Sequence, residues 1–259
     1  MVLGNTPIIF PQVSVLVYHN ITGTAQEDPN DIHSIPIERL QEQINALHAA
    51  GFRHLTIAEA FESLVEGREQ GAGFALTFDD GYCSLQTYLR EIPMQAAPTV
   101  FIITGYTGKS TFEWNTRSSV IHEHLDLEGI RNLREAGFDI QAHGVDHHNL
   151  LKFNDDELRK RFRRLSKWFG SHLMGPPEFL AYPYGYCDAR VKSVVSEFFR
   201  GALSMTHGEW SGPEARFALN RVGIPFYLTG RDLVDILKTP SGSRWYEIEK
   251  RAPWRKGAT

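Results

Sequence analysis

Several features that define other protein classes are scarce in this sequence. Only two of the 259 residues are cysteines, Cys83 and Cys187, which could form one disulfide but not a disulfide framework or a zinc knuckle. No apolar run approaches the roughly 20 residues that cross a bilayer. The formal net charge is -4, so the chain has no basic surplus for binding nucleic acid. A disulfide scaffold, a membrane-spanning protein and a nucleic-acid binder are therefore not expected.

The two ends of the chain also lack familiar signals. The opening MVLGNTPIIFPQVSVLV has neither a basic segment nor a small-residue cleavage site, so it does not resemble a signal peptide. On this sequence alone a cytoplasmic location is expected, and export would require a leader that is removed. The polar, basic tail at 239–259 carries Trp245, Tyr246 and Trp254. We expect it to dock partly through these aromatics, or alternatively to contact a partner subunit or an anionic surface. Nothing indicates the oligomeric state.

What the chain does contain is a regular alternation of short apolar runs and amphipathic helices. Hydrophobic residues make up 42% of it, enough for a buried core. Strands are expected at 13–18, 54–57, 74–78, 98–104, 138–142, 178–182, 201–205 and 221–224. Helices are expected at 36–50, 58–66, 84–91, 125–136, 154–169, 188–199 and 231–238. This alternation predicts an α/β fold with a parallel sheet, open or closed into a barrel.

Three polar clusters directly follow predicted strands. They are the Asp-Asp-Gly at 79–81, the His-Gly-Val-Asp-His at 143–147 and the Tyr-Gly-Tyr at 184–186. In parallel α/β folds, ligands bind at the carboxyl ends of the strands. We therefore expect the three clusters to converge on one face.

The residue types in these clusters indicate metal chemistry. Adjacent carboxylates repel unless a cation or a proton intervenes, so one aspartate could bind a metal while its neighbour acts as a base; a helix N-cap pair is the alternative. His143 and His147 are four residues apart and could share a metal, leaving a position open for water. His148 is a competing ligand. His19 and His207 each follow an apolar run and could reach the same face.

At these residues the sequence resembles the polysaccharide deacetylase family, also called carbohydrate esterase family four or the NodB homology domain. Thr77-Phe78-Asp79-Asp80-Gly81-Tyr82 matches the first family motif completely. Residues 143–150 resemble the second motif, H-(S/T)-x-x-H-P-x-L, and 181–185 resemble the third, R-x-P-Y-G. Residues 16–19 resemble the start of the branch that contains exopolysaccharide and poly-N-acetylglucosamine deacetylases. The likeness extends over about 13–225.

The resemblance implies a distorted (β/α) barrel of about seven parallel strands, forming one catalytic domain over 1–238. It implies that Asp79 is the general base and that the backbone N–H of Tyr184 stabilises the oxyanion. It also implies that Asp80, His143 and His147 hold a metal, usually zinc, with cobalt, nickel or iron as substitutes. The expected substrate is an N-acetylated glycan.

The sequence departs from the family pattern at four places. Gly144 and His148 replace the Ser/Thr and the proline of the second motif. Ala181 replaces the arginine that normally pairs with the base, so the control of the pKa of Asp79 has no assigned residue. The late motif that supplies a histidine acid has no clear match, and His207 is the candidate general acid by position.

The resulting hypothesis is a metal-dependent N-deacetylase of an amino sugar in a glycan. One alternative keeps the metal and changes the substrate to a small amide or formamide. The other alternative is a carbohydrate-binding pseudoenzyme, suggested by the missing arginine and the missing late histidine.

Overall fold

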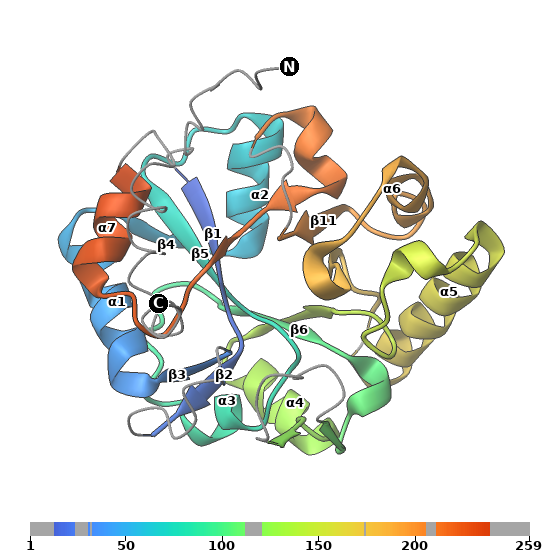
Figure 1. Cartoon of the computed structure of the whole chain (residues 1–259), viewed down its shortest axis with the longest axis horizontal. Coiled ribbons are helices and arrows are strands. Elements are labelled where there is room, and N and C mark those ends of the chain that lie inside the picture. Colours follow the sequence, from blue (N-terminus) through green and yellow to red (C-terminus); the bar gives the residue numbers. More distant parts are fainter. Residues whose placement is uncertain are drawn as a thin grey trace, which may run out of the picture.

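A parallel sheet curls into a nearly closed barrel at the centre of the protein, with helices around it (Figure 1). The computed structural model describes residues 13–23, 31, 33–111, 121–173, 175–205 and 211–238. The strands pair in the order β12-β11-β10-β9-β6-β5-β1-β13, and β4 pairs with β5 beside this path. The predicted distorted (β/α) barrel is confirmed, while the predicted tail at 239–259 lies outside the described residues.

The strands of the barrel are short. Their bounds are β1 Val13–Tyr18, β4 Arg53–Leu55, β5 Gly73–Phe78, β6 Thr99–Ile102, β9 Asp139–Ala142, β10 Phe179–Ala181, β11 Gly201–Ser204, β12 Leu219–Asn220 and β13 Val222–Gly223. Two small strand pairs, which the sequence did not predict, lie outside the barrel sheet. They are β2 Asn20–Thr22 with β3 Ser34–Pro36, and β7 Ser110–Thr111 with β8 His122–Glu123.

The helices follow the predicted alternation. Their bounds are α1 Ile37–Ala49, α2 Ile57–Glu66, α3 Ser84–Thr87, α4 Leu127–Glu135, α5 Asp155–His172, α6 Ala189–Val195 and α7 Gly230–Lys238. Short 3-10 turns are η1 Thr104–Tyr106, η2 Leu150–Lys152, η3 Pro183–Gly185 and η4 Pro213–Phe217. Two helices end four residues earlier than predicted, α3 at 87 and α6 at 195. No helix within the described ranges is both long enough and apolar enough to cross a bilayer.

Local sequence explains where the long helices begin. Asn154 caps α5, since its side chain accepts from the backbone of Glu157 while the Glu157 carboxylate accepts from the backbone of Asn154. This reciprocal capping box is a local sequence pattern that favours a helix start at this position. Thr56 and Glu59 form the same arrangement at the start of α2.

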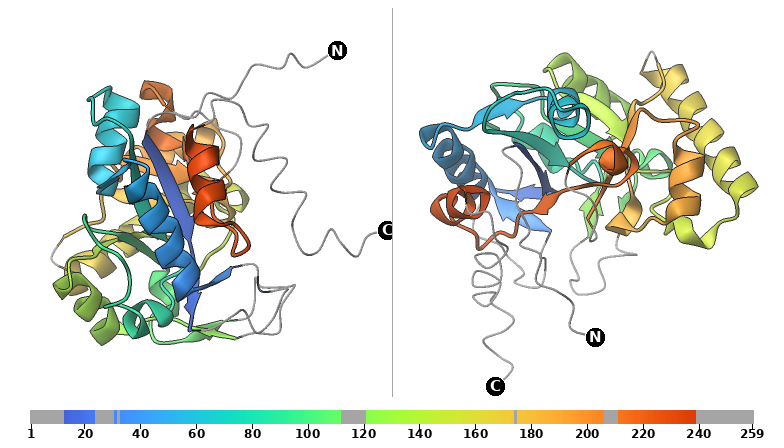
Figure 2. Two further views of the ribbon diagram at one scale, coloured as in Figure 1. Left: turned by 90° about the vertical axis from the view of Figure 1, so that its left-hand side faces the viewer. Right: turned by 90° about the horizontal axis from the view of Figure 1, so that it is seen from above.

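One segment joins the two edges of the sheet. Asn220 in β12 pairs with Ser204 of β11, and Val222 in β13 pairs with Leu16 of β1. Arg221 lies between the two short strands. The segment 219–223 therefore closes the barrel, and Arg221 sits at the seam. α1 and α7 lie side by side outside β1 (Figures 1 and 2).

Side chains along the strands alternate between two hydrophobic clusters, as the two-residue period of a strand requires. In β1, Val13 and Val15 belong to the inner cluster, whereas Leu16 and Tyr18 belong to the outer cluster under the surrounding helices. The inner cluster also contains residues of β5, β6, β10, β11, β12 and α2. This alternation decides which residues at the strand ends can face the barrel axis.

Candidate active site

The site is built at the carboxyl ends of β5, β9 and β10, where the inner rows of the strands continue into loops. Ala75 of β5 and Ala181 of β10 both belong to the inner cluster. Thr77 and Asp79 lie two and four residues after Ala75, so their side chains point to the same side of the strand as that of Ala75. Ala142 of β9 belongs to the outer cluster, so the next residue, His143, faces inward. The alternation within the strands thus directs residues from three loops toward one point.

Asp80, His143 and His147 form a compact buried cluster. One ligand atom from each lies within 4.8 Å of the others. The Nε2 atoms of His143 and His147 are 3.4 and 3.5 Å from Oδ1 of Asp80. The three predicted metal ligands are therefore brought together. His148 is not in this cluster: it is exposed, and its Nδ1 is 3.0 Å from Asp146 Oδ1.

A hydrogen bond fixes the orientation of the first histidine ligand. Nδ1 of His143 is 2.8 Å from the carbonyl oxygen of Ala181. Because a carbonyl only accepts, Nδ1 carries the proton and Nε2 presents its lone pair. That lone pair faces Oδ1 of Asp80, a buried oxygen that receives no hydrogen bond from the described residues. A metal ion between these two atoms would satisfy both of them, so the donor set fits a metal ion.

The electrostatics of the cluster favour the ligand forms of these groups. Burial raises the pKa of Asp80, but the nearby His147, His143 and His19 more than offset this, and the net pKa lies well below its ordinary value. Burial lowers the pKa of His147 to about 3, with Asp80 opposing the shift. A carboxylate and a neutral imidazole, both metal-binding forms, are therefore present near neutral pH.

Arg221 holds Asp79 in a buried bidentate ion pair. Its two terminal nitrogens lie 2.7 Å from Oδ1 and 2.6 Å from Oδ2 of Asp79. One of them also donates to Thr77 Oγ1 at 3.3 Å. Arg221 comes from the closing segment of the barrel and supplies the guanidinium that Ala181 lacks. The sequence reasoning missed this residue, although an arginine within the predicted strand 221–224 was a signal of a buried cation.

The ion pair controls the charge of Asp79. Burial raises the pKa of this carboxyl. The charges of Arg221 and His143 and the hydrogen bonds from Arg221 lower it by more, so the net pKa is below its ordinary value. Oδ2 of Asp79 is 3.8 Å from Nε2 of His143. The ionised carboxylate of Asp79 thus lies beside the metal-ligand cluster of Asp80, His143 and His147 without belonging to it.

Backbone strain is concentrated at the same place. Asp80, His147 and Tyr184 have φ values of 69°, 55° and 60°, and they are the only non-glycine residues in the left-handed region among those described. Each such residue is unfavourable by about 1–3 kcal/mol and persists where the surrounding structure imposes it. At Asp80, the backbone carbonyl accepts a hydrogen bond from His124 Nδ1 at 2.8 Å.

An aromatic rim borders the cluster. The ring of Tyr184 packs against His147 with centroids 4.6 Å apart, and it stacks loosely with Tyr186 at 6.4 Å. Both tyrosine residues are 47% exposed, which is high for large aromatic residues. Met205, next to Gly185, is also exposed. The rim offers flat apolar faces to a ligand that reaches the site.

His19 is a further histidine that interacts electrostatically with the two aspartates. It follows β1 on the inner row of Val13 and Val15, and its ring contacts that of His33 at 4.6 Å. Burial lowers the pKa of His19 to about 4, helped by His33 and opposed by the charges of Asp80 and Asp79. His207, the other candidate for the acid, lies outside the described residues. Cys83 and Cys187 are both free, so they form no disulfide.

The chain is similar in sequence to known proteins. The sequence profile of the family described as polysaccharide deacetylase matches residues 67–198. The protein YxkH of Bacillus subtilis (strain 168), which carries a provisional polysaccharide deacetylase name, is 23% identical over 221 residues, or 85% of this chain and 74% of its own length.

Two solved structures share the fold. The Streptococcus pyogenes deacetylase PplD, in complex with acetate, superposes with a TM-score of 0.73 at 18% identity, covering 90% of this chain and 100% of its own. IcaB from Ammonifex degensii superposes with a TM-score of 0.68 at 20% identity, covering 87% of this chain and 95% of its own.

Proposed function

The chain belongs to the polysaccharide deacetylase family of amide-bond hydrolases, and from this premise we propose that it removes the acetyl group of an N-acetylated amino sugar in a glycan. One observation carries the proposal. Asp79, paired with Arg221, lies beside the cluster of Asp80, His143 and His147. A base and a set of metal ligands in contact are what the hydrolysis of an unactivated amide requires.

Asp80, His143 and His147 would hold a divalent cation. One carboxylate and two imidazoles are a donor set that suits zinc and leaves a further coordination position open. When bound, such a cation acts as a Lewis acid on the amide carbonyl and lowers the pKa of water toward about 7.

The remaining steps belong to side chains and backbone of this chain. Asp79 accepts a proton from the attacking water, and Arg221 keeps this carboxylate ionised and oriented. The backbone N–H of Tyr184, at the left-handed turn beside His147, donates to the oxyanion that forms. Both groups are held in position before the substrate arrives.

His19 is our candidate for the acid that protonates the departing amine. It extends the inner row of β1 and interacts electrostatically with both Asp79 and Asp80. An amine leaves only after it gains a proton. Because burial lowers the pKa of His19 to about 4, His19 would first receive the proton that Asp79 takes from water and would then pass it to the leaving nitrogen. We expect His19→Gln to abolish turnover and His207→Gln to retain it. The reverse outcome would assign the acid to His207.

The proposal is tested by acetate release from N-acetylglucosamine oligomers. The zinc-loaded protein should release acetate, and chelation should stop it. Asp79→Asn should lower kcat by about 10²–10⁴-fold, the usual contribution of a general base. The matched control is Asp139→Asn, which changes a carboxyl at the other end of β9 and should leave kcat unchanged.

The same assay separates the alternatives. Activity that survives both chelation and Asp79→Asn would remove the metal mechanism. Activity on small amides without activity on oligomers would favour the small-amide hydrolase. The pseudoenzyme alternative has lost part of its support, because Arg221 supplies the guanidinium that the third motif lacks.

A further inference from the structure

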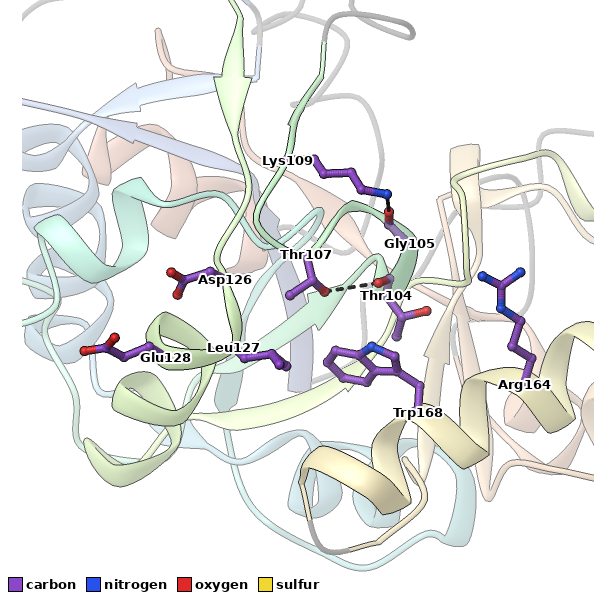
Figure 3. A pocket seen from close by; sticks show the side chains of 9 residues that line it. All are labelled: Thr104, Gly105, Thr107, Lys109, Asp126, Leu127, Glu128, Arg164 and Trp168. Carbon is purple, nitrogen blue, oxygen red and sulfur yellow. Dashed lines mark hydrogen bonds between the residues drawn. The ribbon is translucent and has the colours of Figure 1, made fainter.

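A groove outside the metal cluster lies between the start of α4 and the middle of α5. It has a volume of about 610 Å³, within the roughly 300–1,000 Å³ of typical ligand pockets. Figure 3 shows the indole of Trp168 projecting from α5 toward Thr104 and Leu127, with Lys109 above it and Arg164 to its right. The groove is open to solvent and has an aromatic side chain at its centre.

The lining of the groove suits an uncharged polar ring. Trp168 is half-buried and rests on the hydrophobic core, so its indole is held as a firm surface. The charged side chains around it balance, two cations against two anions: Lys109, Arg164, Asp126 and Glu128. An anionic polymer would meet the two carboxylates, and a cationic one the two bases. A sugar ring instead stacks an apolar face on the indole and bonds its hydroxyls to the charged rim.

The wall of the groove is continuous with the loop of the metal cluster. The groove is lined by Thr104 and Gly105 of η1. The Thr104 N–H donates to the Gly144 carbonyl at 3.2 Å, and the Gly105 N–H donates to the Val145 carbonyl at 2.7 Å. Gly144 and Val145 lie between His143 and His147 in the chain. A ligand in the groove therefore contacts the same turn that supports the metal-ligand loop.

We propose that this groove is a second glycan-binding site, which holds a pyranose unit of the polymer away from the reacting sugar. The inference rests on the proposed function for the class of ligand only. A second contact raises the effective concentration of a long chain at the cluster of Asp80, His143 and His147, whereas a chain too short to span the two places gains nothing from it. The groove would therefore favour long substrates over short ones.

The direct test is binding measured by NMR at the indole of Trp168. The chain has five tryptophans, and the indole N–H signal that disappears in Trp168→Phe identifies this one. The protein carries Asp79→Asn so that the probe is not hydrolysed during the measurement. The probes are N-acetylglucosamine hexamer and cellohexaose. We expect the Trp168 signal to shift with a dissociation constant of the order of 1 mM, as for a single weak subsite.

A second variant guards against a folding defect in Trp168 substitutions. Lys109 and Arg164 are exposed, so Lys109→Ala/Arg164→Ala should fold normally and should weaken the shift several-fold. Lys160→Ala/Lys167→Ala, at exposed positions of α5 that do not line the groove, is the control and should not change it. Absence of a Trp168 shift with both probes, or equal shifts in both double variants, overturns the proposal.

Activity gives an independent readout. With Asp79 intact, Lys109→Ala/Arg164→Ala should raise KM for long N-acetylated oligomers several-fold and leave kcat and the KM for the dimer unchanged. An equal effect on both lengths overturns the proposal. A Trp168 shift without any acetate release would instead preserve the glycan site and remove the deacetylase function, so the two failures are distinguishable.

Discussion

Arg221 and Asp79 are 142 residues apart in the chain, yet their side chains form two parallel hydrogen bonds at the inner wall of the barrel. The side chain of Arg221 is fully buried and that of Asp79 is 4% exposed. Ala181, the position at which the family places its arginine, belongs to the same inner cluster as Phe101, and the Arg221 guanidinium lies 5.4 Å from the Phe101 ring. The guanidinium thus reaches the inner side of the barrel from the closing segment 219–223.

Removing Arg221 should therefore disable the base. Breaking a buried pair by deleting one partner is unfavourable by about 3–5 kcal/mol, because the other charge stays buried. In Arg221→Gln we expect a lower melting temperature, a large loss of kcat and an acid limb of the pH–rate profile that moves to higher pH. The limb moves up because the charge that lowers the pKa of Asp79 is gone. An unmoved limb would contradict the assignment.

Returning the arginine to its family position should rescue part of this loss. We expect Ala181→Arg/Arg221→Ala to be more active than Arg221→Ala alone. The coupling between the two sites should be about 1–3 kcal/mol, as for neighbouring residues that share a partner. The single variant Ala181→Arg, which places two guanidinium groups near one carboxylate, is the control and should be destabilised. If the effects of the two substitutions on activity simply added, Arg221 would not be doing the work of an arginine at position 181.

Metal binding should depend on His143 and not on His148. His143→Ala removes a buried ligand whose orientation is fixed by Ala181. Its zinc affinity should fall by more than the roughly 10–100-fold that loss of an outer hydrogen-bond partner causes. The exposed His148 pairs with Asp146, so His148→Ala should bind one zinc ion as the wild type does. Elemental analysis and zinc competition titrations measure both affinities.

At the turn of η3, adding one methyl group at Gly185 should lower kcat more than removing the whole ring of Tyr184. Tyr184→Gly removes the aromatic ring but keeps a backbone N–H in a left-handed turn that glycine adopts readily. We expect KM to rise about five- to tenfold from lost stacking, with a smaller change in kcat. Gly185→Ala would place a Cβ 2.6 Å from the Met205 backbone nitrogen and would displace the turn. It should lower kcat more than Tyr184→Gly does; the opposite order would exclude the backbone donor.

Stability should fall between pH 6.5 and 4 because of a histidine far from the metal cluster. Burial, then the charge of His48, lowers the pKa of His54 from 6.5 to about 4. The unfolded chain therefore takes up a proton in this range that the folded chain does not, which favours unfolding as the pH falls. The contribution is up to about 3 kcal/mol. Urea unfolding at pH 7 and pH 5 should show a shallower pH dependence in His54→Phe than in the wild type or in His148→Gln.

The parts of the site that the sequence predicted are those carried by strand ends. Asp80, His143 and His147 follow apolar strands, and parallel strands bring their carboxyl ends together. The metal cluster could therefore be predicted without knowing how the barrel closes. The long helix predicted at 154–169 is also found as α5, because its capping box at Asn154 and its hydrophobic periodicity are local patterns.

The remaining features depend on long-range packing. Arg221 lies between two strands of two residues each, which carry too little periodicity to reveal a face. Its role follows only from the pairing of Val222 with Leu16 and of Asn220 with Ser204. The left-handed conformations of Asp80 and His147 are likewise imposed by tertiary contacts, because neither residue type favours them enough to be predicted.

The position of the seam at 219–223 late in the chain also affects when the enzyme becomes active during its synthesis. During synthesis, the metal ligands leave the ribosome long before Arg221 does, so a nascent chain can gather Asp80, His143 and His147 while Asp79 still lacks its guanidinium partner. On the proposed mechanism, we expect hydrolysis to begin only when the segment 219–223 docks between β11 and β1. Closure of the barrel and the onset of catalysis would then coincide, and a chain that ends before this segment should be inactive.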